Sequence, residues 1–379
     1  MVLATMRLEL GRLRTVPALS LLAVLGSACA TGLGPKAVRN ERPDYNQQIL
    51  RSANAELLLN LVRLRYNDTP LFLELGTVVA SYGYDASLNA GGTIPASGTN
   101  VANLGSAFAY GEHPTITYTP LTGEQFATRM LTPIPLDALM LFEQSGWRAD
   151  RLLLVAVQRV NDLLNAPTAS GPTPEREPYY EAFDDFAERF ERLRSAGLMG
   201  FNWEVKEHEK DPPGRNPRFW IRAPADPNSA LAADVASVRR ALDLEAGKEE
   251  FYLSGFPYKR MPNEVAVRCR SLLGVLYFLS NAVELPAEHV KAGLVTVTVG
   301  DDGQPFSWSK VTGKVLTVHS QEGRPQKAYV AVQHRGWWFY IADDDRSSKA
   351  TFSLLNILYS LQQATGQGKS PVLTLPVVR

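Results

Sequence analysis

Two neighbouring segments of the chain alternate in polarity with a period of two residues. From Val78 to Asn89, apolar or aromatic residues take the even-numbered positions, and the odd-numbered positions are mostly small or polar. A similar alternation returns after a loop rich in Gly, Ala, Ser, Thr and Asn at about 90–103, and it continues to Tyr118. Successive side chains of a β-strand point to opposite faces, so this pattern is typical of strands with one apolar face. We therefore predict one long β-hairpin over residues 78–118.

The remainder of the chain combines helical and strand patterns. Residues 45–66 and 179–196 carry apolar side chains at three- and four-residue spacing, which indicates amphipathic helices. We also expect helices within residues 151–164 and 263–283, and strands at 295–299, 314–318, 327–334 and 337–341. The predicted fold is α+β: a helical N-terminal half carries the one long hairpin, and a mixed α+β C-terminal half has antiparallel strands.

Composition divides the chain into four predicted parts. A stretch rich in Pro, Ser, Thr and Gly at residues 165–174 is the expected internal boundary. The segment before the first predicted helix contains Gly, Pro and charged residues without periodicity, which is typical of a flexible tether. In chain order we expect a signal peptide, a tether, a helical region with the hairpin and an α+β domain, at residues 1–28, 29–43, 44–165 and 175–379.

Residues 1–28 have the layout of an export signal. Three basic residues, Arg7, Arg12 and Arg14, precede a short apolar stretch, and small residues then lead to Cys29. The apolar stretch is shorter than the ~20 residues of a membrane-spanning helix, so we expect a segment that is cleaved off.

The sequence around Cys29 resembles the lipobox of bacterial lipoproteins, in which the cysteine is acylated. Gly26 stands where that box usually has leucine, and Leu25 lies one position earlier. Plain secretion after cleavage at Ala30 is the alternative, because residues 28–30 also form a small-x-small site. By resemblance to Gram-negative sorting rules, Ala30 points to the outer membrane. We therefore expect a protein that is anchored there by lipid. The sequence does not indicate whether it faces the periplasm or the cell surface.

Charge and cysteine content exclude several classes of function. The 39 Lys and Arg residues balance the 39 Asp and Glu residues, so the chain lacks the cationic excess that nucleic-acid binding requires. Only two cysteines are present, which excludes a disulfide framework and a cysteine-based zinc site. Cys269 lies in an apolar run, where a free thiol behaves as a small hydrophobe. We expect no cofactor and no nucleic-acid partner.

Two short motifs resemble catalytic signatures, but their contexts do not fit. Residues 368–370 read Gly-Lys-Ser, like the end of a phosphate-binding loop, yet position 363 is Gln where that loop requires glycine. Residues 307–310 match the Ser-x-x-Lys pattern of serine acyltransferases, whose serine begins a helix. The residues that follow favour a turn and then a strand, so we assign no catalytic residue.

Three consecutive aspartates, Asp343, Asp344 and Asp345, precede a predicted helix that starts near Ser347. Acidic residues at this position cap free N–H groups and complement the helix dipole. The alternative is a metal or acid–base site that these aspartates form with His334. No pair of histidines has the spacing of a helical metal site.

Aromatic residues cluster on the predicted strand at 337–341. Trp337 and Phe339 fall on one face, and Trp338 and Tyr340 on the other. We expect one face to lie in the core. Trp337, Trp338 and Tyr340 are candidates for binding a carbohydrate or a protein partner, and packing beneath a helix is the alternative.

Three stretches together resemble an uncharacterised group of Gram-negative, mainly proteobacterial, envelope lipoproteins of unknown function. They are Leu-Leu-Leu-Asn-Leu-Val-Arg-Leu-Arg-Tyr at 57–66, Tyr-Thr-Pro-Leu-Thr-Gly-Glu at 118–124 and Arg-Gly-Trp-Trp-Phe-Tyr-Ile at 335–341. The resemblance covers most of the mature chain. It implies an envelope address and no particular activity or catalytic residue.

The function expected from these features is an assembly, structural or interaction role in the cell envelope, without enzymatic activity. We expect the chain to contact the membrane through its lipid. We also expect it to bind envelope proteins or further copies of itself. Residues Tyr82, Tyr84, Phe108 and Tyr110 are the hairpin's candidates for membrane or oligomer contacts. A more specific version of this hypothesis is that the hairpins of several copies join edge to edge into an oligomeric barrel. The alternative is that the hairpin packs on the helices of its own chain. An envelope hydrolase acting on glycan or peptide is a second candidate function, and a carbohydrate-binding module is a third.

Overall fold

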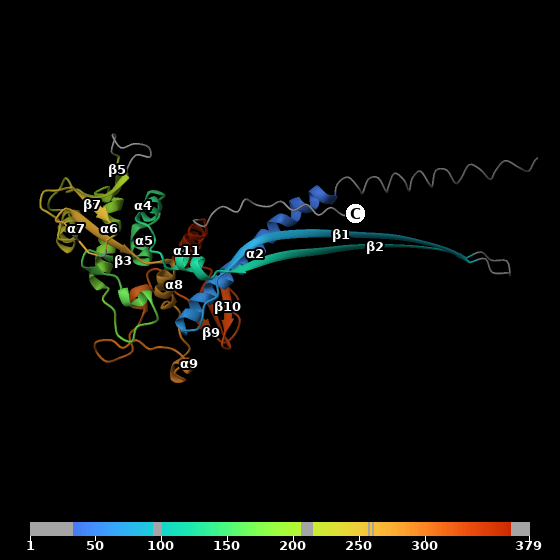
Figure 1. Cartoon of the computed structure of the whole chain (residues 1–379). Coiled ribbons are helices and arrows are strands. Elements are labelled where there is room, and N and C mark those ends of the chain that lie inside the picture. The colour runs from blue at the N-terminus through green and yellow to red at the C-terminus, as the bar shows by residue number, and fades with distance from the viewer. Residues whose placement is uncertain (1–32, 94–100, 206–214, 257, 260, 365–379) are drawn as a thin grey trace, which may run out of the picture. The chain divides into compact units, whose positions relative to one another are not determined.

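The fold mixes helices and strands, so the α+β class is confirmed (Figure 1). The chain forms two compact units, Met1–Leu57 and Leu58–Arg379. The computed structural model describes residues 33–93, 101–205, 215–256, 258–259 and 261–364. The predicted signal peptide and Cys29 lie outside these residues, as does the Gly-Lys-Ser motif at 368–370.

Helix α2 (Leu33–Arg65) is longer than the apolar pattern indicates. It begins before Tyr45 and takes in residues 33–43, where the sequence predicts part of a flexible tether. Pro35 lies in the first turn, where no helical hydrogen bond needs its N–H, whereas Pro43 lies in the helix interior and removes one such bond. In the second unit, Leu58 and Leu61 of α2 are fully buried.

Strands β1 (Leu73–Thr93) and β2 (Val101–Pro120) form an antiparallel two-stranded sheet (Figure 1). Their register runs from Leu73↔Pro120 to Thr93↔Val101, with one irregularity between Leu75 and Val78. The strands extend beyond the predicted 78–118 because their ends, rich in Gly, Thr and Asn, carry little alternation.

A six-stranded sheet has the order β4-β3-β8-β7-β6-β5. Its β7–β8 pair is parallel and its other neighbours are antiparallel. The strands are β3 (Val157–Val160), β4 (Leu163–Leu164), β5 (Met199–Val205), β6 (Arg215–Ile221), β7 (Glu250–Ser254) and β8 (Glu264–Cys269). The sheet includes strands on both sides of residues 165–174, so the boundary predicted there does not separate two folding units.

Two predicted helices are partly strands. Helix α5 (Ala149–Ala156) ends where β3 begins, and β8 precedes α8 (Leu272–Ser280). Five of the six residues of β8 are buried, and its short alternation runs directly into the apolar sequence of α8. A short apolar run of this kind has the same appearance in a buried helix and a buried strand.

Helix α6 (Glu181–Ser195) provides the aromatic part of the core, where the sequence predicts a helix. Phe183, Phe186, Phe190 and Leu193 lie on its buried face. The ring centroid of Phe190 lies 5.3 Å from that of Phe201 on β5 and 6.4 Å from that of Phe219 on β6. Helix α7 (Ala230–Ala241) packs beside α6.

A three-stranded antiparallel sheet, β10-β11-β9, and helix α11 (Arg346–Ala364) follow. The strands are β9 (His319–Gln321), β10 (Ala328–His334) and β11 (Trp337–Ala342). Residues 295–299 and 314–318 are not strands, contrary to expectation. The shorter helices are α3 (Gly123–Phe126), the π-helix Ala127–Leu131, α4 (Leu136–Gln144), the 3₁₀-helix Pro167–Ser170, α9 (Ala287–Lys291) and α10 (Ser309–Thr312).

Candidate functional site

The β1–β2 hairpin has two faces of different composition. Positions that lie directly opposite in an antiparallel pair share a face. The register sets Tyr84 opposite Tyr110 and pairs even-numbered positions with even-numbered ones throughout the run. The aromatic candidates Tyr82, Tyr84, Phe108 and Tyr110 therefore belong to one face, with Glu112 as its one charged residue between 78 and 116. The other face consists mostly of Gly, Ala, Ser, Thr and Asn.

The outer edges of this hairpin have no strand partner in the described part of the chain. Strand β1 pairs with β2 alone, and β2 with β1 alone. Each outer edge therefore presents a row of backbone N–H and C=O groups that a further strand can pair with. An isolated two-stranded hairpin is at best marginally stable in water, so this one needs another surface.

The junction between α2 and β1 is fixed by side chains from distant parts of the chain. The Asn60 side chain accepts a hydrogen bond from the Leu71 N–H at 2.9 Å and donates one to the Leu71 carbonyl at 2.6 Å. The Asp68 carboxylate lies 3.0 Å from Nε2 of His334 and 2.8 Å from Nη2 of Arg335. The root of the hairpin is thereby joined to the turn between β10 and β11.

Tyr66 forms the buried side of this junction. Its hydroxyl lies 2.7 Å from Nδ1 of His289, and its ring makes edge contacts with the rings of His289, His334 and Phe339. Burial raises the pKa of Tyr66 to about 12. The phenol therefore stays neutral at physiological pH, within hydrogen-bond distance of His289.

The aspartates at 343–345 do not form an acid–base site with His334, which instead contacts Asp68. Asp345 accepts hydrogen bonds from the backbone N–H of Ser348 at 3.0 Å and from its hydroxyl at 2.5 Å, and so caps α11. Burial opposes ionisation of Asp345, but these hydrogen bonds hold its pKa below the usual value. Asp343 pairs with Lys349 at 2.7 Å. Among the described residues, no group of His, Cys, Asp and Glu has metal-binding geometry.

The three aromatic candidates of β11 are half-buried. Trp337 donates its indole N–H to Glu288, whereas Phe339, on the same face of the strand, is fully buried. On the opposite face, the ring of Trp338 lies 5.5 Å from the guanidinium carbon of Arg324. Tyr340, also on that face, packs against the ring of His319. Trp338 and Tyr340 thus retain partial exposure with cationic or titratable neighbours.

The Ser-x-x-Lys motif at 307–310 does not assemble a catalytic pair. A helix is present where the sequence predicts a turn, but α10 begins at Ser309 and spans only four residues. The hydroxyl of Ser307 lies 2.8 Å from that of Ser309, and the Lys310 ammonium lies 5.5 Å from the ring of Phe306.

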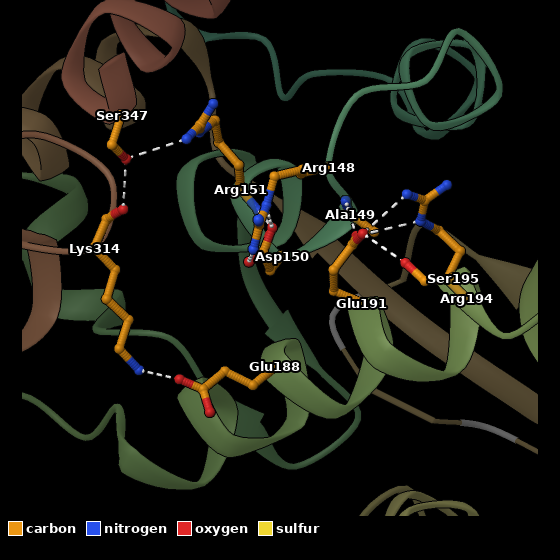
Figure 2. A network of polar contacts seen from close by, with 10 residues as sticks. All are labelled: Arg148, Ala149, Asp150, Arg151, Glu188, Glu191, Arg194, Ser195, Lys314 and Ser347. Atoms are coloured by element: carbon orange, nitrogen blue, oxygen red, sulfur yellow. Dashed lines mark hydrogen bonds and ion pairs between the residues drawn. The ribbon is translucent and has the colours of Figure 1, made fainter. Parts of the chain in front are cut away.

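A polar pocket that the sequence did not indicate lies among α5, α6, the residues before β9 and the start of α11 (Figure 2). Its volume is about 600 Å³. Its polar lining residues are Arg148, Asp150, Arg151, Glu188, Glu191, Arg192, Lys314, Arg346 and Ser347. No local motif marks these residues, because the fold gathers them from four separate segments.

No helix of the described residues is both long enough and apolar enough to cross a bilayer. Comparison with known proteins finds no family model, no curated protein and no solved structure that matches this chain.

Proposed function

We propose that this chain is a non-enzymatic, lipid-anchored protein of the outer membrane with an assembly or structural role in the envelope, and that its copies associate through the β1–β2 hairpin. The observation that carries the proposal is the ladder from Leu73↔Pro120 to Thr93↔Val101, which pairs with no other described strand. In this proposal the helical N-terminal half, with its one long hairpin, is the associating part of the chain.

Pairing between copies satisfies both edges of the hairpin. The two strands of each hairpin run in opposite directions, so β1 of one copy can pair antiparallel with β2 of the next. A closed ring of such copies leaves no edge unpaired. Backbone groups that are removed from water need such partners, because each unsatisfied one costs about 1–3 kcal/mol.

The difference between the two faces supports the same proposal. The face that includes Tyr82, Tyr84, Phe108 and Tyr110 suits burial in lipid or against a neighbour, and the Gly-, Ala- and Ser-rich face suits contact with water. Strands of 21 and 20 residues also exceed the ~9–11 residues that a strand needs to cross a bilayer.

The lipid anchor is inferred from the sequence around Cys29. A short apolar stretch and small residues precede this cysteine, and the alternative secretion site at Ala30 would release the protein instead. A lipid anchor holds every copy at the same surface, which raises the local concentration for association between hairpins.

Adjacent positions on opposite faces of β1 provide the test. Ala86→Lys places a charge on the aromatic face, and Ser87→Lys places the same charge on the small-residue face. A lysine that faces lipid costs about 2–4 kcal/mol at the middle of a bilayer. We expect the parent and Ser87→Lys to remain multimeric after extraction in detergent, and Ala86→Lys to be monomeric. Light scattering gives the mass, and chemical cross-linking gives the subunit number.

A strictly monomeric parent would refute association through the hairpin. Equal multimers of both lysine variants would show that the aromatic face plays no part in it. Thermal unfolding of the two variants serves as the control, because neither position belongs to the six-stranded sheet.

A further inference from the structure

The pocket among α5, α6 and α11 contains five cationic side chains and three carboxylates. Most of these charges already have partners. Asp234 pairs with Arg192 at 2.9 Å, Asp150 with Arg148 at 2.6 Å and Glu191 with Arg194 at 3.0 Å. The Lys314 ammonium contacts both Asp184 and Glu188.

Two arginines of the lining, Arg151 and Arg346, have no ion pair among the described residues. Arg151 donates from Nη2 to the Ser347 hydroxyl at 3.1 Å, and its buried Nε has no hydrogen-bond partner. Arg346 directly precedes Ser347, and its side chain is exposed. Both residues line the same pocket.

The polar contacts around Arg151 connect the segments that form the pocket wall. Figure 2 shows Arg151 joined to the Ser347 hydroxyl, which donates to the backbone carbonyl of Lys314 at 3.0 Å. The ammonium of Lys314 in turn reaches Glu188 of α6. One chain of contacts thus links α5, the start of α11, the residues before β9 and α6 around the opening.

Asp150, the neighbour of Arg151 in the chain, forms no ion pair with the Arg151 guanidinium. Asp150 accepts hydrogen bonds from the Arg148 side chain at 2.6 Å and from the backbone N–H of Arg151 at 2.7 Å. Burial lowers the pKa of Arg151, which shows that its guanidinium has lost part of its hydration. The charges of Asp150 and Asp345 oppose this shift without cancelling it. A partly desolvated cation that forms no ion pair binds an anion more strongly than a hydrated one.

We propose that this pocket binds a phosphate monoester through Arg151 and Arg346. At neutral pH a phosphate monoester carries a charge of about −1.5 to −2, which matches the two unpaired guanidinium groups, whereas a carboxylate carries −1. Arginine also presents donors in a fork that fits phosphate oxygens. The volume of about 600 Å³ leaves room for the group that the phosphate esterifies.

Calorimetry of the full detergent-extracted chain tests the proposal with two sources of the same chemistry. The probes are glucose 1-phosphate in solution and vesicles that contain phosphatidic acid, with phosphatidylcholine vesicles and the dicarboxylate malonate as comparisons. We expect glucose 1-phosphate or phosphatidic acid to bind, and whichever of the two binds identifies the source. Tighter binding of malonate than of both phosphates would overturn the assignment to phosphate, and no binding of either phosphate would overturn the site.

The variants distinguish this pocket from general surface charge. Arg346→Gln removes an exposed cation, so folding is not at risk, and we expect affinity to fall about tenfold or more, the effect of losing one charge-assisted contact. Arg151→Gln should act in the same direction. The matched control is Arg240→Gln, at an exposed arginine of α7 outside the pocket. Equal affinity of the parent and Arg346→Gln would refute the proposal, whatever the outcome for the hairpin.

Discussion

Arg270 is the largest fully buried side chain of the described residues, and no described carboxylate forms an ion pair with it. Its guanidinium donates to the backbone carbonyls of Leu154, Val155 and Val157, and it also contacts Ser170 and Asn165. The first two carbonyls belong to the last turn of α5, where no helical N–H is available. A cation at this end also complements the helix dipole. The charge is therefore stabilised by backbone dipoles in place of a counter-ion.

We predict that Arg270→Met destabilises the protein by about 3 kcal/mol, because it removes the side-chain donor of the Val155 and Asn165 carbonyls at about 1–3 kcal/mol each, whereas the Leu154 and Val157 carbonyls keep the Asn165 donor. The free energy of unfolding from chemical denaturation measures the effect. Arg240→Met, at an exposed position, is the control and should change stability by less than about 0.5 kcal/mol. A near-neutral Arg270→Met would show that the carbonyls find other donors.

Single residues were the least predictable level of the structure. The sequence shows Arg270 only as a charge within an apolar run, and Asn165 only as part of a turn-rich stretch. In the structure both donate to carbonyls at the end of α5. Tertiary packing brings these partners together, and for Arg270 they lie more than a hundred residues away in the chain. No local sequence pattern contains that information.

At the scale of elements, the junction of α2 with β1 is sensitive to acid through His334. Burial lowers the pKa of His334, although Asp68 raises it and Arg335 and Arg63 assist the lowering. The neutral imidazole is therefore favoured in the folded state, and the unfolded chain takes up the proton first. This contribution to stability is complete above the unfolded pKa of about 6.5 and is lost as the pH falls toward the lowered pKa of the folded state.

We predict that the parent loses more stability than His334→Gln between pH 7.5 and pH 5.5. Glutamine keeps a hydrogen-bond donor for Asp68 but does not titrate. Thermal unfolding midpoints of the two proteins across this range measure the difference. A parallel loss in both would mean that other groups carry the acid sensitivity.

An element is predictable from sequence when its polarity pattern continues over many residues. It is poorly predictable when it is short and mostly buried. Alternation locates the hairpin, and helical spacing locates α6 with its phenylalanines. By contrast, β8 is only six residues long and runs into the apolar sequence of α8, so the combined stretch predicts one helix where the structure has a strand and a helix. The start of α2 escapes prediction because residues 33–43 contain Gly and Pro and lack an apolar stripe.

At the scale of the whole molecule, the two cysteines have different chemistry. Burial raises the pKa of the Cys269 thiol to about 12, so it remains protonated and unreactive. Cys29 follows the predicted export signal. We predict that Cys29→Ser abolishes acylation of the mature N-terminus and membrane fractionation, and that Cys269→Ala changes neither.

Mass spectrometry of the N-terminal peptide and membrane fractionation provide the readouts. If Cys29→Ser matured and fractionated like the parent, the lipid anchor would be disproved and the envelope role would lose its main support. The pocket proposal does not depend on this result, because its residues lie between positions 148 and 347. That spread along the chain is also why no local pattern predicts the pocket.

The ladder of the hairpin has a consequence for the order in which the molecule forms. Its innermost pair, Thr93↔Val101, joins positions eight residues apart, and its outermost, Leu73↔Pro120, joins positions 47 apart. Once the innermost pair has formed, each further pair closes only a slightly longer loop and costs little additional chain entropy. The two strands can therefore pair one residue after another, independently of the six-stranded sheet. The hairpin can therefore form early, but it stays only marginally stable until another surface covers it. In the proposed association, its unpaired edges would remain open to any passing strand until a neighbouring copy pairs with them.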